Sequence, residues 1–132
     1  MFPALTNVPS MMSIIKNAPL NVAAFTATGD ITKEDFEQTV MPHVKAVIEE
    51  YGELNYVLNL DTDLGNFSMG AWLEDALLGI KHLTKWNRAA IVTNKQGVQV
   101  FTSIFSKVMP GEFRGYDKEE LEKAINWAST GK

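Results

Sequence analysis

The sequence predicts a single α/β domain whose mixed five-stranded sheet opens with an antiparallel hairpin and continues with parallel strands. Strand-like and helix-like patterns alternate along the 132 residues in the order ββαβαβαβα. Each strand–helix–strand unit favours parallel neighbours joined by a right-handed crossover. A chain of this length suits one domain, since domains typically hold about 100–150 residues. We expect residues 11–132 to form the domain, residues 1–10 to precede it as an extended lead-in, and the helices to lie mainly on one face of the sheet.

The first two strands are expected at 11–16 and 21–29, where apolar residues and β-formers gather. Residues 17–20 between them read Asn-Ala-Pro-Leu, which is a turn signal. Two strands joined by so short a turn should pair in antiparallel fashion.

A helix is expected over 32–51, because apolar residues recur every four positions from Phe36 to Ile48. Pro42 lies inside this stretch. Proline lacks a backbone donor and crowds the preceding turn, so it should kink the helix or split it in two.

The third strand is expected at 54–60 and alternates in character. Leucine and tyrosine occupy one face, whereas Asn55, Val57 and Asn59 occupy the other. This alternation indicates a sheet that is well covered on one side only. The open side should carry a semi-apolar surface around Ala23, Phe25, Ala27 and Val57. Such surfaces often pair across a two-fold axis, so a homodimer is expected.

The next helix should begin at Ser68, a good N-cap, and its buried stripe extends to Ile80. A fourth strand is expected at 89–93. Asn94 can cap a further helix, whose apolar stripe ends at Val108.

A brief fifth strand, 112–116, should lead into a last helix over 117–128. Asp117 is placed to cap this helix, and Glu120 stands at the third helical position. That spacing is typical of a capping box, in which the glutamate side chain accepts from the backbone N–H of the cap residue.

Composition excludes several classes of function. Lys plus Arg number 12 and Asp plus Glu number 16, and the formal net charge of −4 argues against nucleic acid and against a polybasic membrane anchor. The absence of cysteine excludes disulfides, thiol catalysis and Cys-ligated zinc. With His43 and His82 as the only histidines, we expect no metal site and no cofactor. Residues 1–10 lack the features of a secretory signal and no apolar run is long enough to span a membrane, so a cytoplasmic protein is expected.

The order of elements and several short motifs resemble the STAS domain of bacterial anti-sigma-factor antagonists. More closely, the chain resembles the SpoIIAA-like (STAS/Sec14-type) family of small bacterial proteins. The motifs are Gly-Asp-Ile-Thr at 29–32, Asp-Phe at 35–36, Met-Pro at 41–42, Trp-Leu-Glu-Asp at 72–75, Arg-Ala-Ala-Ile-Val-Thr at 88–93, Pro-Gly-Glu-Phe-Arg at 110–114 and Ala-Ile-Asn-Trp at 124–127. The resemblance implies a fold. Related folds bind partner proteins or, in Sec14-type domains, lipids.

The resemblance also draws attention to Ser68. In STAS antagonists the loop after the third strand holds a phosphorylatable serine in an Asp-Ser-Ser-Gly motif. The corresponding stretch here retains Ser68 and Gly70 but has Phe67 in place of the aspartate. This departure argues against kinase control.

One candidate site follows from the topology. Ligands of open α/β sheets bind beyond the carboxyl ends of parallel strands, and free N–H groups at helix starts favour an anion there. The residues expected at this ligand or partner edge are Asp61, Thr62, Asp63, Ser68, Thr93, Asn94 and Lys95. Helix capping alone also explains Ser68 and Asn94.

A second candidate site surrounds the helix that begins at Ser68. Its expected pocket lining is Trp72, Asp75, His82, Trp86, Arg88, Phe101 and Phe105. Asp75 with Arg88 or His82 could instead form a salt-bridged lock. Aromatic residues at helical spacing also commonly belong to a core.

Two functions remain open. The first is a non-catalytic module that binds a protein partner or a small amphipathic, lipid-like ligand. The alternative is a Mg²⁺-dependent phosphatase, because 58–63 resembles the hhhh-D-x-D opening of haloacid-dehalogenase-type enzymes, in which Asp61 and Asp63 would hold the metal and attack a phosphate. Leu-Gly replaces the Gly-Thr that usually follows, and no downstream apolar strand ends in an acidic pair. The non-catalytic interpretation is therefore preferred.

Overall fold

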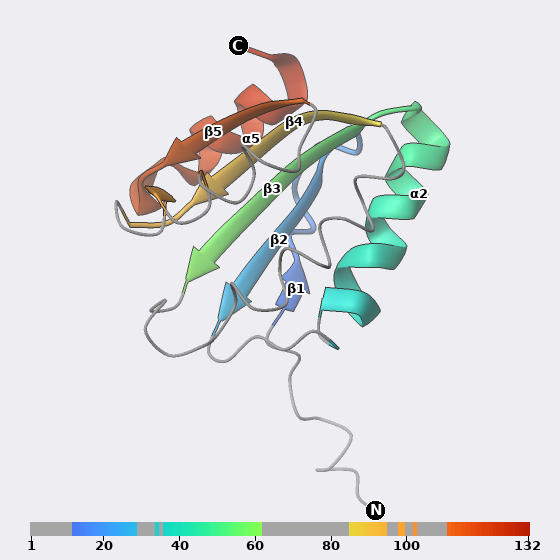
Figure 1. Cartoon of the computed structure of the whole chain (residues 1–132), viewed down its shortest axis with the longest axis horizontal. Helices are drawn as coiled ribbons and strands as arrows, with labels where there is room; N and C mark the ends of the chain where they lie inside the picture. The colour runs from blue at the N-terminus through green and yellow to red at the C-terminus, as the bar shows by residue number, and fades with distance from the viewer. Residues whose placement is uncertain are drawn as a thin grey trace, which may run out of the picture.

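The computed structural model describes residues 12–28, 34, 36–61, 85–94, 98–99, 102 and 111–132 of the chain. Its strands form one sheet in the order β1-β2-β3-β4-β5 (Figure 1). The strand bounds are Met12–Ile14 for β1, Ala23–Thr28 for β2, Leu54–Asp61 for β3, Trp86–Val92 for β4 and Glu112–Tyr116 for β5. β1 is antiparallel to β2 and the other pairs are parallel. The predicted mixed five-stranded sheet is therefore confirmed.

The helix predicted over 32–51 is a π-helical turn, Phe36–Val40, followed by the α-helix α2, Met41–Tyr51. Pro42 lies in the first turn of α2, a position at which proline is common. The helical run is continuous from Phe36 to Tyr51 and changes type, from π to α, next to Pro42, where the sequence predicted a kink or a split. The helix ends at Gly52, which adopts the left-handed conformation typical of a C-terminal cap.

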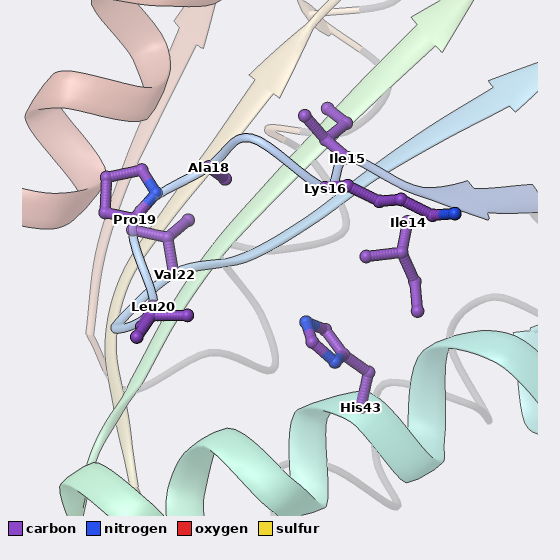
Figure 2. Close-up of a pocket in the computed structure, with 8 residues that line it drawn as sticks. All are labelled: Ile14, Ile15, Lys16, Ala18, Pro19, Leu20, Val22 and His43. Carbon is purple, nitrogen blue, oxygen red and sulfur yellow. The ribbon is translucent and has the colours of Figure 1, made fainter.

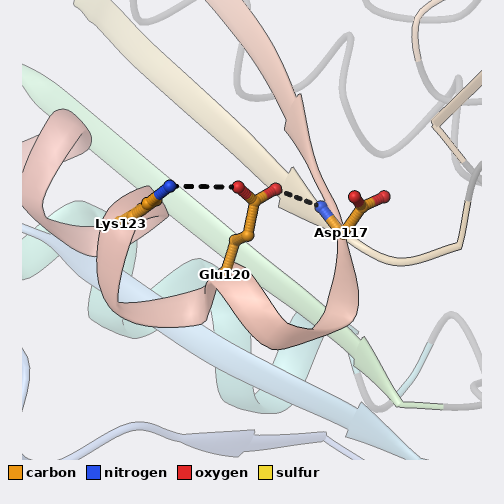
Figure 3. Close-up of polar contacts among 3 residues, drawn as sticks. All are labelled: Asp117, Glu120 and Lys123. Atoms are coloured by element: carbon orange, nitrogen blue, oxygen red, sulfur yellow. Dashed lines mark hydrogen bonds and ion pairs between the residues drawn. The ribbon is translucent and has the colours of Figure 1, made fainter.

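The last helix begins where the sequence predicts. A short 3₁₀ turn, Lys118–Glu120, leads into α5, Leu121–Thr130. The backbone N–H of Asp117 donates to Glu120 Oε1 at 3.0 Å, and Lys123 Nζ lies 3.5 Å from Glu120 Oε2 (Figure 3). The backbone hydrogen bond, together with the Lys123 ammonium, holds the pKa of Glu120 below its ordinary value. The Glu120 carboxylate therefore links Asp117, the residue that follows β5, to the first turn of the helix.

The sheet has an apolar core on each face. The α2-side core joins Val40, Val44 and Val47 to the sheet residues Met12, Ala23, Phe25, Ala27, Leu54, Tyr56, Leu58, Leu60, Trp86, Ala89 and Ile91. The α5-side core joins Ala124, Trp127 and Ala128 to Val22, Ala24, Val57, Ala90 and Val92. Neighbouring residues of one strand enter different cores because successive side chains of a strand point to opposite faces.

The two described helices, α2 and α5, cover opposite faces of the sheet. The other two predicted helices, which begin at Ser68 and Asn94, fall largely outside the described residues. The polar residues Asn55 and Asn59 of β3 suggested an open second face, but Val57 between them is fully buried beneath α5. Asn55 is also fully buried, because hydrogen bonds within the fold satisfy its amide. A polar strand residue does not mark an exposed face when its polar atoms find such partners.

The sequence predicted an exposed semi-apolar surface as the basis of a homodimer, and the prediction of that exposed surface is wrong. Ala23, Phe25, Ala27 and Val57 are all fully buried. The three β2 residues lie in the α2-side core and Val57 lies in the α5-side core, so they do not even share a face. The two helices occupy the surface that was assigned to a second copy of the chain.

Candidate functional site

The predicted ligand edge lies where the parallel strands end. Asp61 is the last residue of β3, is exposed, and pairs in register with Thr28 at the end of β2. Thr93 and Asn94 directly follow β4, which pairs with β3 in parallel. The fold therefore brings Asp61, Thr93 and Asn94 to the same edge of the sheet, as the topology predicted.

Thr93 and Asn94 have clear backbone roles at this edge. The N–H of Thr93 donates to Tyr116 O at 3.0 Å, which extends the pairing of β4 with β5. The carbonyl of Asn94 accepts from Val98 N at 3.0 Å. Thr93 is fully buried, and its Oγ1 has no hydrogen-bond partner in the part of the chain that the structure describes.

Most of the other predicted site residues lie outside the described residues. They are Thr62, Asp63, Ser68 and Lys95 of the ligand edge and Trp72, Asp75, His82, Phe101 and Phe105 of the expected pocket. The phosphatase hypothesis needs Asp61 and Asp63 together, so it remains a sequence-level prediction.

The structure separates Trp86 from Arg88, which the sequence placed in one group. Leu54 pairs with Trp86 but the next residue, Asn55, pairs with Arg88, so the register shifts by a bulge. Trp86 consequently packs in the α2-side core. Arg88 instead reaches α5, where its Nη1 donates to Ala128 O at 2.8 Å. Arg88 thus joins β4 to α5 through a backbone carbonyl, while Asp75, its predicted salt-bridge partner, lies outside the described residues.

An amide network that the sequence analysis missed lies at the amino ends of β3 and β4. Asn87 Nδ2 donates to Asn55 Oδ1 at 2.8 Å and to Glu53 Oε2 at 3.2 Å, and Asn55 Nδ2 donates to Asn21 O at 3.2 Å. Asn21 Nδ2 in turn donates to Ser129 O at 3.0 Å, near the end of α5. These partners all belong to the chain itself, so the network joins elements of the fold. Two asparagines at strand positions 55 and 87 were its signal in the sequence.

A hollow of about 80 Å³ lies between the β1–β2 connection and α2 (Figure 2). The residues that line this β1–β2 hollow are Ile14, Ile15, Lys16, Ala18, Pro19, Leu20, Val22 and His43. Leu20, in the turn, is 81% exposed and Ile14 is 38% exposed. Exposed aliphatic side chains beside an apolar hollow form the kind of continuous apolar surface that marks contact sites.

His43 approaches the hollow from α2, and its ring points toward the β1–β2 connection (Figure 2). The ring meets Phe25 edge-on, with the two centroids 5.5 Å apart and the planes at 89°. Burial lowers the pKa of His43 from its ordinary value of 6.5, so the imidazole is neutral at pH 7. A neutral imidazole has one N–H donor and one acceptor nitrogen.

The β1–β2 hollow is mainly apolar. Its wall combines six apolar residues with one lysine and one histidine. Across the described residues, no group of three or more His, Cys, Asp or Glu side chains could hold a metal ion. None of the helices described has the length and apolar character that a membrane span requires.

Sequence reasoning treated residues 17–20 only as a turn and assigned His43 no role. The available signal was Leu20, a large aliphatic residue that follows proline in a turn, where polar residues are usual. The contribution of His43 could not be read from the sequence, because α2 approaches the turn only through the packing of the sheet.

Comparison with known proteins gives two findings. A model of the SpoIIAA-like family matches residues 22–129. Among solved structures, the chain is similar to an uncharacterised protein of the DUF3478 family with a SpoIIAA-like fold from Shewanella loihica PV-4. The two are 27% identical, with a TM-score of 0.57, over 81% of this chain and 83% of that chain. No curated protein matches this chain.

Proposed function

The chain belongs to the SpoIIAA-like family, as its motifs predicted, and we propose that it is a non-catalytic module that binds a protein partner. The β1–β2 hollow is the proposed contact site. Protein interfaces concentrate their binding energy where a few apolar side chains fill well-packed pockets.

The observation that carries this proposal is the exposure of Leu20 and Ile14 beside the hollow. Leu20 is 81% exposed, although burying a leucine side chain contributes about 1.5–3 kcal/mol. The neighbouring Pro19 restricts the turn that presents it, so little conformational entropy is lost when a partner covers this surface.

The size of the hollow favours a protein partner over a small amphipathic ligand. Sites that enclose small molecules typically measure about 300–1,000 Å³. The β1–β2 hollow, at about 80 Å³, has room for one side chain of a partner and leaves the rest of that partner on the surface. A lipid-like ligand would keep most of its apolar area in water there.

Site-specific photo-crosslinking in cells tests the proposal. A photoreactive amino acid replaces Leu20 in one variant and Tyr51 in a matched control, since Tyr51 is also a large exposed side chain, at 42%, but does not line the hollow. We expect a discrete protein adduct from position 20 and none from position 51. A Leu20→Asp change in an affinity-tagged chain should release the same protein.

The outcomes separate the two classes of ligand. Equal adducts from positions 20 and 51, or none from position 20, would contradict the proposed site. Native mass spectrometry of the purified chain tests whether a small molecule is bound instead. A bound small molecule that Leu20→Asp removes would favour the amphipathic ligand instead.

A further inference from the structure

Among the described residues, the wall of the β1–β2 hollow carries two hydrogen-bond donor groups and no acidic side chain. The six apolar residues Ile14, Ile15, Ala18, Pro19, Leu20 and Val22 form most of it. Lys16 adds an ammonium group from the β1–β2 connection, and His43 adds a neutral imidazole from α2. In Figure 2 the two polar side chains flank Ile14, one from each element.

The volume of the hollow limits what can enter it. A cavity of roughly 150 Å³ accommodates a benzene ring. The hollow here measures about 80 Å³, so it suits one compact side chain, and its mainly aliphatic lining favours a branched aliphatic one. An isoleucine, leucine or valine of a partner would therefore bury its apolar atoms against Ile14 and Val22.

The donors determine what lies beside that aliphatic side chain. A carboxylate accepts hydrogen bonds from an ammonium and from an imidazole N–H, and charged hydrogen bonds are about twice as strong as neutral ones. A lysine or arginine of the partner would instead meet Lys16 as a like charge. Resting on the proposed function, we infer that the β1–β2 hollow binds a protein segment in which one branched aliphatic residue is flanked by acidic residues.

The net charge of the chain makes this preference diagnostic. The formal net charge is −4, so long-range electrostatics disfavour an acidic segment. If acidic segments still bind more tightly than basic ones, the preference must come from Lys16 and His43 in the hollow, because the net charge of the chain would favour the opposite order.

Three short peptides of equal length test the inference on the full chain: Glu-Leu-Glu, Lys-Leu-Lys and Glu-Ala-Glu, each with blocked ends. Methyl NMR spectra of Ile14, Ile15 and Val22 measure binding in the hollow directly. We expect Glu-Leu-Glu to shift these signals, and the other two peptides to bind at least about tenfold more weakly.

A charge reversal supplies the matched variant. Lys16→Glu should transfer the preference to Lys-Leu-Lys, whereas Lys45→Glu, an exposed lysine of α2 that does not line the hollow, should leave it unchanged. Both variants change the net charge equally, so only the position of the lysine differs.

The failure of this inference is distinguishable from that of the proposed function. If the uncharged peptide Gln-Leu-Gln binds as well as Glu-Leu-Glu, the acidic preference is wrong while the hollow remains a contact site. If no leucine peptide shifts the methyl signals at millimolar concentration and position 20 gives no crosslinked protein, both are overturned.

Discussion

Arg88 joins the end of α5 to the sheet through one charged hydrogen bond. Its Nη1 lies 2.8 Å from Ala128 O, and its guanidinium packs closely under Gly131, where an added Cβ would lie 2.8 Å from Nη2. A cation at the carboxyl end of a helix also meets the negative end of the helix dipole. Both effects favour the same placement of α5 on the sheet.

Replacing Arg88 should therefore weaken the fold measurably. We expect Arg88→Met to lower the free energy of unfolding in urea by about 1–3 kcal/mol, because a charged hydrogen bond is lost and Ala128 O loses its donor. Arg114→Met is the control. The guanidinium of the exposed residue Arg114 lies over the Trp127 ring, 4.8 Å from its centroid, and a cation–π contact made by an exposed cation contributes only about 0.5–1 kcal/mol. Equal losses in the two variants would contradict the special role of Arg88.

His43 should give the protein a pH-dependent stability. Its pKa is below 6.5 in the folded chain because burial disfavours the charged imidazolium, whereas in the unfolded chain it returns to about 6.5. The unfolded state therefore binds a proton first as pH falls. The stabilising contribution is complete above pH 6.5 and is lost as pH falls through the lower, folded pKa.

A series of urea titrations between about pH 7.5 and pH 5 measures this effect. We expect the wild-type free energy of unfolding to fall more steeply over this interval than that of His43→Gln, which cannot bind a proton there. Parallel curves for the two proteins would show that His43 does not titrate differently in the folded state.

At the scale of elements, α2 depends on residues at both of its ends. At its start, Pro42 lies in the first turn, where the fixed φ of proline suits the helix. Gly52 ends it with a φ of 76°, and its N–H donates to Ile48 O at 2.8 Å. A Cβ added at Gly52 would meet nothing within 4 Å, so only the backbone conformation requires glycine there.

Substitutions at Gly52 isolate that backbone cost. We expect Gly52→Ala to lower the free energy of unfolding by about 1–2 kcal/mol, because an L-residue is strained in the left-handed region. Gly52→Asn should cost less, since asparagine tolerates this conformation. Urea denaturation compares the two, and equal costs for alanine and asparagine would exclude the backbone explanation.

At the scale of the whole molecule, the sheet separates two cores that α2 and α5 cover from opposite sides. Each core contains residues from three or more strands, so neither helix can be lost without exposing apolar sheet. Within the described residues, the two cores meet only through the sheet.

Double-mutant cycles test this separation. Val44→Ala in the α2-side core and Trp127→Leu in the α5-side core should each lower the free energy of unfolding by roughly 1–3 kcal/mol. Their effects should add to within about 0.5 kcal/mol, because the described residues place them in separate cores on opposite faces of the sheet. Val40→Ala with Val44→Ala, one turn apart in the same core, should deviate more from additivity. Strong coupling between Val44 and Trp127 would show that the sheet transmits packing changes.

Much of this architecture could be read from the sequence. The turn at 17–20 and the Asp117–Glu120 helix start depend on residues close together in the chain, and both are confirmed. Near Pro42, where an interruption was predicted, the helix changes from π to α. The alternation of strand and helix patterns predicted the mixed sheet for the same reason. At the candidate ligand edge, parallel pairing correctly placed Asp61 beside Thr93 and Asn94, since topology alone brings strand ends together.

Local pattern by itself thus determined which elements this protein forms, in which order, and to which family it belongs. Tertiary structure alone decided the rest. The bulge at β3 and β4 separated Trp86 from Arg88, and hydrogen bonds across the sheet buried Asn55 on a face that its polarity had marked as open. The β1–β2 hollow exists because α2 brings His43 against a turn more than twenty residues earlier in the chain. No short-range pattern encodes such contacts, because they depend on how the complete sheet packs.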